Sequence, residues 1–382
     1  DFAIQWLPEA GSEEANRLNK DIARHVKARF CLNEGTHYKY HDELEYASEA
    51  EKWLQMAATE SDKLITSGRY EIYNTGHPQE DYFNMYRIDD KSDLKEAVLY
   101  VDYKTNIREH NMAAAGREAG CGFSKSFVES FLCSDGLPIS LSNKYLGDET
   151  MRKETANRDP RLKQLILTND FPTNVTDDLK DSTFVVNEDE FITQHCFTGY
   201  RPIKGFNPIY SQALYMKSSF DGIAYRYAET LLINAEAKAE LNTITNADLD
   251  RTVNQLRDRV GMPHLTVNVG FTDPKWPDWG YSLSPVLQEI RRERCIELAG
   301  EGFRFNDLKR WKAGKLLNNV LTYVGKRKPD GNLAIVYPNY TNPDLSYQAG
   351  KSRTWEDKMY LYPIPTGELQ RNPQLLPQNP GW

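Results

Sequence analysis

Residues 285–312 carry the strongest structural constraint in the sequence, because glutamates recur there at every fourth position. They are Glu289, Glu293, Glu297 and Glu301. Residues four apart lie on one face of an α-helix, so this spacing predicts one acidic ridge. Arginines and apolar residues occupy the positions between the glutamates, which favours an amphipathic helix held by ion pairs. We therefore interpret the row as structural rather than as a metal site or an acid–base pair.

The same segment resembles the signature of a known protein family. Its core, RRERCIELAGEGFRFNDLKRW at residues 291–311, is similar to the signature of the SusD/RagB family of outer-membrane nutrient-binding lipoproteins. Other segments resemble further blocks of that family, in the family's order, at residues 127–137, 157–162, 221–237, 256–263 and 360–382. The resemblance therefore extends from about residue 120 to the end of the sequence.

The resemblance implies both a fold and a function. The implied fold is mainly α and SusD-like, with a scaffold of TPR-like helical pairs and a loop-rich subdomain that contains short strands. The implied function is to capture oligosaccharide or polysaccharide at the cell surface and deliver it to a SusC-like TonB-dependent outer-membrane transporter. The alternative is a peptide-binding SusD-like protein for oligopeptide uptake. Members of the family are lipid-anchored and surface-exposed on the outer membrane, and we expect the anchor to lie outside this chain.

Apolar residues at helical spacing predict two helical pairs. The first pair covers residues 14–33 and 47–67, and the second covers residues 224–241 and 246–260. A single pair cannot bury its apolar face alone, so such pairs stack on one another, as they do in tetratricopeptide scaffolds. The periodicity is therefore compatible with the fold that the resemblance implies.

Between the pairs, residues 70–220 show no sustained helical period, and Gly, Asn, Asp and Pro are scattered through them. Two runs in this region, Glu96–Asp102 and Ser182–Val186, predict short strands. We expect four parts: a helical pair at 1–70, a loop-rich ligand-binding subdomain at 71–220, TPR-like helices and the signature helix at 221–320 with an inserted aromatic loop at 262–284, and C-terminal loops packed on the scaffold at 321–382.

The inserted loop provides the first candidate ligand site. Trp276, Trp279 and Tyr281 lie within six positions of one another, in a stretch too polar and too interrupted to form a core. Aromatic rings stack on the apolar C–H face of a sugar, while flanking polar groups such as Asp278 bond its hydroxyls. In the alternative interpretation, the two tryptophans only fix the loop onto the scaffold.

Two other segments contribute candidates. Tyr82 and Tyr86, in the loop-rich part, could share the sugar site, although tyrosine is equally natural in a half-buried strand. Asn111, in the polar loop 104–122, offers an amide to sugar hydroxyls, but an ordinary solvated connection would have the same composition. The predicted ligand-binding residues are therefore Trp276, Trp279, Tyr281, Asp278, Tyr82, Tyr86 and Asn111.

Composition and motifs argue against several other classes of protein. The net charge of −8 argues against nucleic acid or an anionic membrane as the main partner. No run of about 18 apolar residues indicates a transmembrane helix. The five cysteines lie far apart and form no CxxC, so neither a metal site nor a disulfide framework is expected. No familiar catalytic motif occurs, and carboxylates on one helix face cannot flank a scissile bond. We expect a protein without catalytic activity or cofactor.

Overall fold

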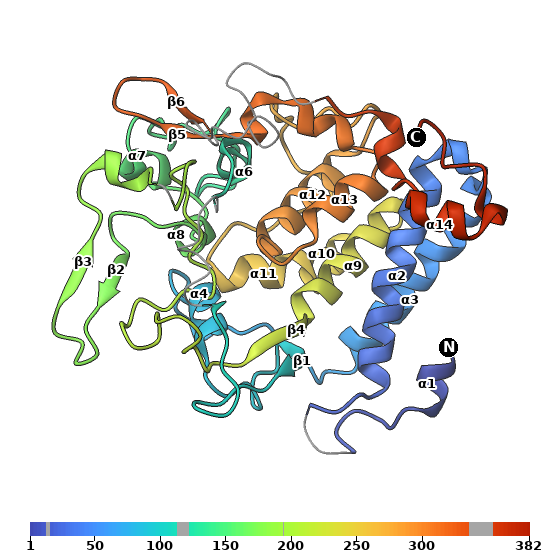
Figure 1. The fold of residues 1–382 in the computed structure, drawn as a ribbon, viewed down its shortest axis with the longest axis horizontal. Helices are drawn as coiled ribbons and strands as arrows, with labels where there is room; N and C mark the ends of the chain where they lie inside the picture. The colour runs from blue at the N-terminus through green and yellow to red at the C-terminus, as the bar shows by residue number, and fades with distance from the viewer. Residues whose placement is uncertain (13–15, 113–121, 194, 336–353) are drawn as a thin grey trace.

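The structure is a computed structural model, and it describes residues 1–382 except 13–15, 113–121, 194 and 336–353. The long helices lie together on one side of the molecule, and short strands and loops occupy the other side (Figure 1). The α-helices are α1 Phe2–Trp6, α2 Lys20–Tyr40, α3 Ala50–Thr66, α4 Asp81–Asn84, α6 Lys125–Ser130, α7 Met151–Thr155, α8 Arg161–Leu165, α9 Tyr227–Glu240, α10 Asn246–Asp250, α11 Val253–Arg259, α12 Pro285–Glu297, α13 Arg304–Arg310 and α14 Thr366–Arg371. The strands are β1 Ala97–Val101, β2 Pro172–Val175, β3 Ser182–Phe184, β4 Gly222–Arg226, β5 Val324–Arg327 and β6 Leu333–Ile335. Short 3₁₀ helices span Asp42–Leu44, Ala47–Glu49, Met85–Arg87, Glu188–Phe191, Gly314–Asn318, Val320–Thr322, Asp357–Tyr360 and Pro373–Leu375.

The first predicted pair forms as α2 and α3, which lie side by side (Figure 1). Helix α2 begins later than the apolar pattern predicts, because the side chain of Asn19 caps it by accepting hydrogen bonds from two backbone N–H groups of the first turn. The two helices approach each other closely at Gly35, where an added Cβ would lie 2.8 Å from the side chain of Leu54. A residue without a side chain is therefore needed at this crossing.

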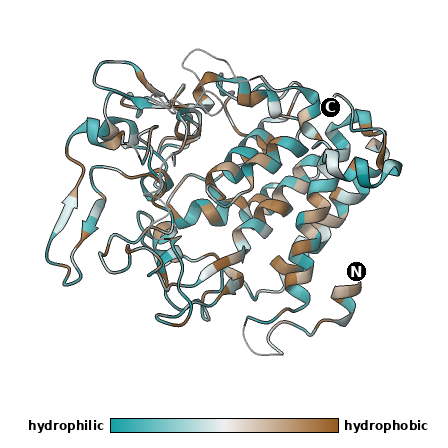
Figure 2. Cartoon of the chain, in the orientation of Figure 1, coloured by the Kyte–Doolittle hydropathy of each residue, from teal (hydrophilic) through white to brown (hydrophobic). Residues whose placement is uncertain are grey.

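Helix α9 is the centre of the scaffold, since every one of its residues except Lys238 is buried. One side of α9 packs against α2 and α3 through Ile233 and Ala237. Another side packs against α10, α11 and α12 through Leu231 and Leu232. Both polar and apolar residues occur along these helices (Figure 2). Some of the polar residues of the scaffold, such as Asn234 and Glu236, are buried. The predicted helix after α9 is divided into α10 and α11 at Thr252, whose φ of −130° and ψ of −95° are not helical.

The segment predicted as one helix over 285–312 is instead two helices, α12 and α13, and this part of the prediction is wrong. The intervening turn contains Gly300 at φ +75° and Gly302 at φ +85°, a backbone conformation that glycine adopts without steric cost. Glu301 therefore lies in the turn between them, outside the acidic ridge of α12.

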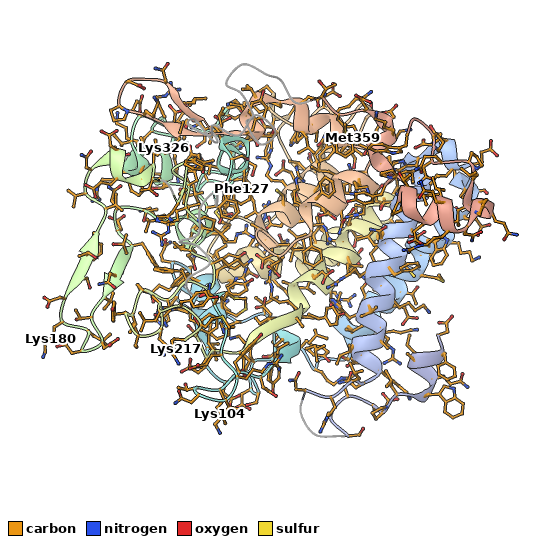
Figure 3. All side chains as sticks on the ribbon, viewed as in Figure 1. Lys104, Phe127, Lys180, Lys217, Lys326 and Met359 are labelled. Atoms are coloured by element: carbon orange, nitrogen blue, oxygen red, sulfur yellow. The ribbon has the colours of Figure 1, made fainter. Side chains whose placement is uncertain are left out.

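The loop-rich part is built on small antiparallel sheets, and the two runs predicted as strands contain β1 and β3. Strand β1 pairs with β4, which leads directly into α9. Strands β2 and β3 form a hairpin that projects from the body, with Lys180 pointing away from it (Figure 3). The largest core cluster joins residues of this part, such as Tyr82 and Phe131, to Ile296 of α12. The loop-rich part thus shares its core with the helical scaffold.

The glutamates of α12 are buried, and arginines from other elements bind Glu293 and Glu297. Oε1 of Glu297 accepts a hydrogen bond from Nη1 of Arg226 at 2.6 Å, and its Oε2 accepts one from Nη2 of Arg259 at 2.6 Å. Nη1 of Arg161 donates to the same Oε2 at 3.1 Å and to Oε1 of Glu293 at 2.5 Å. These arginines belong to β4, α11 and α8. The network therefore connects the loop-rich part to the scaffold.

The expectation that ion pairs fix this helix is confirmed, but most partners differ from those that the spacing suggests. Among the described residues of α12, the ion pair within the helix joins Arg292 to Glu289 at 3.3 Å. Arg294 instead binds Asp307 of α13, and Arg291 binds Glu240 of α9. The helix is consequently buried on most of its surface and does not present a solvated charged face.

The surrounding arginines determine the charge state of Glu297. Burial alone would raise the pKa of this carboxyl group, but the positive charges of Arg259, Arg226 and Arg161 outweigh that effect and hold the pKa well below its ordinary value of 4.5. Glu297 is therefore ionised in the folded protein. Its contribution to stability is complete above the pKa of the unfolded chain and decreases as the pH falls below that value.

Replacing this carboxylate is expected to destabilise the fold strongly. In Glu297→Gln, three buried arginines lose their shared counter-charge, so the free energy of unfolding should fall by about 3–5 kcal/mol. Urea unfolding at pH 7 measures the change. Glu368→Gln, which removes an exposed carboxylate paired with Arg371, is the matched control and should alter stability little. The difference between wild type and Glu297→Gln should shrink as the pH is lowered below about 4.5, the ordinary carboxyl value. A loss of stability as small as that of the control, or a difference that is independent of pH, would contradict the conclusion that Glu297 is the ionised counter-charge of these arginines.

Candidate functional site

The aromatic loop before α12 divides into a buried part and a surface part. Trp279 is 6% exposed, and its Nε1 donates a hydrogen bond to Oε1 of Gln288 at 2.6 Å. Its ring meets that of Trp311 edge-on, with the ring centroids 5.5 Å apart. The hydroxyl of Tyr281 donates to the backbone carbonyl of Trp311. These two predicted residues thus pack against the end of α13.

A buried arginine explains why the aromatic residues gather here. The guanidinium of Arg291 lies 4.7 Å from the ring centroid of Trp279, 4.4 Å from that of Trp311 and 5.8 Å from that of Tyr281. Tyr40 of α2 forms another wall at 5.0 Å. Cations are attracted to the faces of aromatic rings, most strongly where water is excluded. The geometry favours the alternative interpretation for Trp279 and Tyr281, in which they fix the loop onto the scaffold, and their role in ligand binding stays a prediction.

Trp276 and Asp278 form the surface part of the loop. Trp276 is half-buried, and its Nε1 donates to Oε1 of Glu289 at 2.7 Å. The ring of half-buried Phe271 lies 6.0 Å from it at an interplanar angle of 32°. Asp278 is exposed and accepts a hydrogen bond from the backbone N–H of Gly280 at 2.9 Å. An aromatic pair and an exposed carboxylate therefore lie on the same loop.

The second group of predicted residues lies at the other end of α12. Tyr82 is completely buried, and its hydroxyl donates to the backbone carbonyl of Glu297 at 2.6 Å. Tyr86 is half-buried and donates to Oε1 of Glu301 at 3.1 Å. Glu289, which Trp276 contacts, is eight positions before Glu297, or about 12 Å along the helix axis. The structure therefore separates the tyrosines from the aromatic loop.

Asn111 contacts a loop other than the aromatic loop. Its Oδ1 accepts a hydrogen bond from the backbone N–H of Met216 at 3.2 Å, which joins two loops of the loop-rich part. The next residue, Met112, lines the cavity described below. Residues 113–121 of the same predicted loop lie outside the described part of the chain.

A cavity of about 730 Å³ lies where the two parts of the molecule meet. Its walls come from α2, β4, α9, α12, α13, the turn between the last two helices, and segments of the loop-rich part. Of the predicted ligand-binding residues, Tyr86 alone lines it. The charged side chains in its walls are Arg29, Lys204, Asp221, Arg226, Glu229, Arg294, Glu301, Asp307 and Arg310.

Most of these charges are paired. Nζ of Lys204 lies 2.6 Å from Oε1 of Glu301, which also receives Nη2 of Arg226 at 2.7 Å. Burial lowers the pKa of Lys204 to about 8, with Glu301 opposing the shift, so the amine is mostly protonated at pH 7. Burial would raise the pKa of Glu229, but His25 and Arg29 together lower it to about 2. The cavity is thus lined by ionised groups with fixed partners.

Sequence reasoning missed this cavity because its walls converge from distant segments. Arg29 belongs to the first helical pair, Lys204 to a loop, and Glu301 to the turn after α12. The spacing of residues along the chain does not predict that these segments lie together in the fold. The one available signal was Gly300-Glu301-Gly302, where two glycines flank a charged residue inside a segment of helical pattern.

No group of three or more His, Cys, Asp or Glu side chains that could hold a metal ion occurs among the described residues. Likewise, none of the helices in the described ranges is both long enough and apolar enough to cross a membrane.

Comparison with known proteins identifies the family. The sequence model of the SusD family matches residues 56–382. The chain belongs to the SusD family. Among curated SusD relatives, SusD-like protein P2 from Formosa agariphila is 33% identical over 166 residues, which cover 44% of this chain and 27% of that protein. The match thus spans about a quarter of the length of this curated relative.

Solved SusD-like structures share the fold. A SusD-like protein from Bacteroides fragilis superposes with a TM-score of 0.68 at 25% identity, covering 99% of this chain and 68% of that one. A second protein from the same species, described as a SusD-like carbohydrate binding protein, superposes with a TM-score of 0.65 at 22% identity, covering 98% and 68%. The predicted fold class, a mainly helical SusD-like scaffold with short strands, is confirmed. The four-part division of the chain stays a prediction.

Proposed function

We propose that this protein captures oligosaccharide or polysaccharide at the outer-membrane surface and delivers it to a SusC-like TonB-dependent transporter. The observation that carries the proposal is the family match over residues 56–382. The description of one structural neighbour as a carbohydrate binding protein is compatible with it. The rival ligand class, oligopeptide, has no support among the similar proteins.

The surface part of the aromatic loop is the proposed sugar contact. Phe271 and Trp276 present neighbouring rings, and exposed Asp278 lies two positions beyond Trp276. A sugar ring stacks its C–H face on such rings and donates its hydroxyls to a carboxylate. The hydrogen bond from Trp276 to Glu289 fixes the indole on α12, so a ligand would meet a ring of defined orientation.

Binding without hydrolysis is the proposed activity. A glycosidase needs two carboxyl groups facing each other across the scissile bond. The most regular carboxylates of the chain, Glu293 and Glu297, are buried and bound by arginines, so neither is available to a substrate. We therefore propose that the chain holds the glycan without cleaving it.

A glycan-binding panel tests the proposal. Phe271→Ala removes one of the two stacking rings and no hydrogen-bonding group. The affinity for the polysaccharide that binds best should therefore fall about tenfold, or ~1.4 kcal/mol. Trp53→Ala removes a half-buried aromatic side chain of α3 and is the matched control, with unchanged affinity expected. Calorimetry against a panel of polysaccharides and oligopeptides provides the readout. Binding to peptides alone would overturn the function, and equal affinities of wild type and Phe271→Ala would overturn the site.

Delivery requires a complex with the transporter. Tagged protein expressed in its own cells is expected to co-purify with a SusC-like transporter from detergent-solubilised outer membranes. Deletion of the gene should abolish uptake of the labelled glycan that binds best in the panel. Uptake at the wild-type rate in the deletion strain would contradict the delivery role, even if glycan binding in solution holds.

A further inference from the structure

A second hollow, of about 450 Å³, lies where the end of α3, residues 70–74, the start of α9 and α11 meet. We call it the Tyr227 hollow. Its apolar lining comes from Ile65, Tyr70, Ile72 and Tyr227, and two amides of its lining belong to Asn74 and Gln255. It shares no lining residue with the cavity described above. Its volume lies in the range of small-molecule sites, which is roughly 300–1,000 Å³.

The apolar lining is an edge of the scaffold core. Tyr227 belongs to that core, and the half-buried side chains of Ile65, Tyr70 and Ile72 pack against it. The rings of Tyr70 and Tyr227 are stacked, with their centroids 5.8 Å apart and an interplanar angle of 29°. Aromatic rings and aliphatic side chains held in this way form a fixed apolar surface, which suits the C–H face of a sugar ring.

Tyr227 also carries a polar group that the protein leaves unused. The residue is 3% exposed, yet its hydroxyl forms no hydrogen bond with any other residue that the structure describes. The hydroxyl is not sealed off, because its oxygen retains contact with solvent. Since Tyr227 lines the hollow, a ligand in the hollow can reach this oxygen. Hydroxyls of buried tyrosines usually have a partner, so the exception marks a position suited to a polar ligand atom.

This hydroxyl stays protonated at neutral pH. Burial raises the pKa of Tyr227 to about 12, although the positive charge of Arg251 opposes the rise. A protonated phenol donates one hydrogen bond and accepts another. The group can therefore serve a ligand atom of either kind.

Two amides of the hollow have unused hydrogen-bonding groups as well. Oδ1 of Asn74 accepts a hydrogen bond from the backbone N–H of Gly76 at 3.0 Å, and Nε2 of Gln255 donates to the backbone carbonyl of Arg251 at 3.0 Å. The other atom of each amide forms no hydrogen bond within the described part of the chain. The hollow therefore offers a donor at Asn74, an acceptor at Gln255 and the hydroxyl of Tyr227, which can do both.

The charged side chains of the hollow already have partners outside it, which argues for a neutral ligand. The pairs are Arg251 with Asp62 at 3.1 Å, Glu71 with Lys95 at 2.8 Å and Asp258 with His264 at 2.7 Å. A carboxylate only accepts hydrogen bonds and an ammonium group only donates them, whereas a hydroxyl does both. The mixture of unused donors and acceptors therefore favours a ligand that carries several hydroxyls.

We propose that the Tyr227 hollow is a second glycan subsite, which binds a neutral sugar residue through the hydroxyl of Tyr227 and the amides of Asn74 and Gln255. This inference rests on the proposed function, because the sugar belongs to the glycan that the protein captures. The hollow does not include Phe271 or Trp276, so a polysaccharide has two separate places of contact on the chain. Once one contact forms, the second is intramolecular, which raises the overall affinity for a long glycan.

Removal of the hydroxyl alone tests the subsite. Tyr227→Phe breaks no hydrogen bond among the described residues, so the midpoint of urea unfolding should equal that of wild type. The affinity for the neutral polysaccharide that binds best in the panel should fall about fivefold, because one hydrogen bond to the sugar is lost. Tyr215→Phe makes the same change at a tyrosine that is 75% exposed and lies outside the hollow, and it should bind like wild type.

The outcomes separate this subsite from the proposed function. If Tyr227→Phe binds as tightly as wild type while Phe271→Ala binds more weakly, the subsite is wrong and the proposed function stands. Wild type that binds acidic polysaccharides but no neutral one would also overturn the subsite alone. Wild type that binds no polysaccharide at all would overturn both.

A second variant connects the binding to this hollow. Asn74→Asp keeps the size of the side chain and the acceptor for the N–H of Gly76, but it replaces the Nδ2 donor with an oxygen. Asn74 is exposed, so the fold should stay intact, and the affinity for the same polysaccharide should fall about fivefold. Asn242→Asp makes the same change at an exposed asparagine outside the hollow and is the matched control. Equal affinities of the two variants would mean that no sugar lies in the hollow, and the proposal would be wrong.

Discussion

The fold depends on one buried carboxylate, that of Glu297, and on the arginines that surround it. Arg259, Arg226 and Arg161 reach it from positions 38, 71 and 136 residues away in the sequence. Removing ionised groups from water is costly unless each finds its partner, so none of these segments can be buried stably without the others. The loop-rich part and the helical scaffold consequently share one ionic centre in addition to a shared apolar core.

Helix α12 places the proposed sugar contact of the aromatic loop relative to that centre. Near its beginning, Glu289 holds the indole of Trp276, and Arg291 holds the buried part of the aromatic loop through Trp279. Toward its end, Arg294 lines the cavity. The segment that identifies the SusD family therefore provides none of the side chains proposed to contact the glycan. It fixes the orientation of the aromatic loop, which carries some of them.

Local patterns predicted local structure well. Apolar periodicity located α2, α3 and α9, because burial of one face leaves a period in the sequence. The same periodicity missed the break at Gly300 and Gly302, although glycines within a helical pattern are a visible warning. The row of glutamates was recognised as structural, but the arginines that bind it could not be predicted. The spacing of residues in the sequence predicts only which side chains are neighbours on the same helix. Loop composition likewise could not distinguish buried Trp279 from half-buried Trp276, because both lie in the same polar stretch.

The most direct test of the shared ionic centre is a double-mutant cycle between Arg226 and Glu297, measured by urea unfolding of Arg226→Met, Glu297→Gln and the double variant. A cycle isolates the interaction between two groups from the other effects of each replacement. If the two groups stabilise the fold jointly, the double variant should lose ~2–3 kcal/mol less than the sum of the single losses. Losses that add within ~0.5 kcal/mol would mean that the two side chains act independently, and the dependence of the fold on this ionic centre would be contradicted.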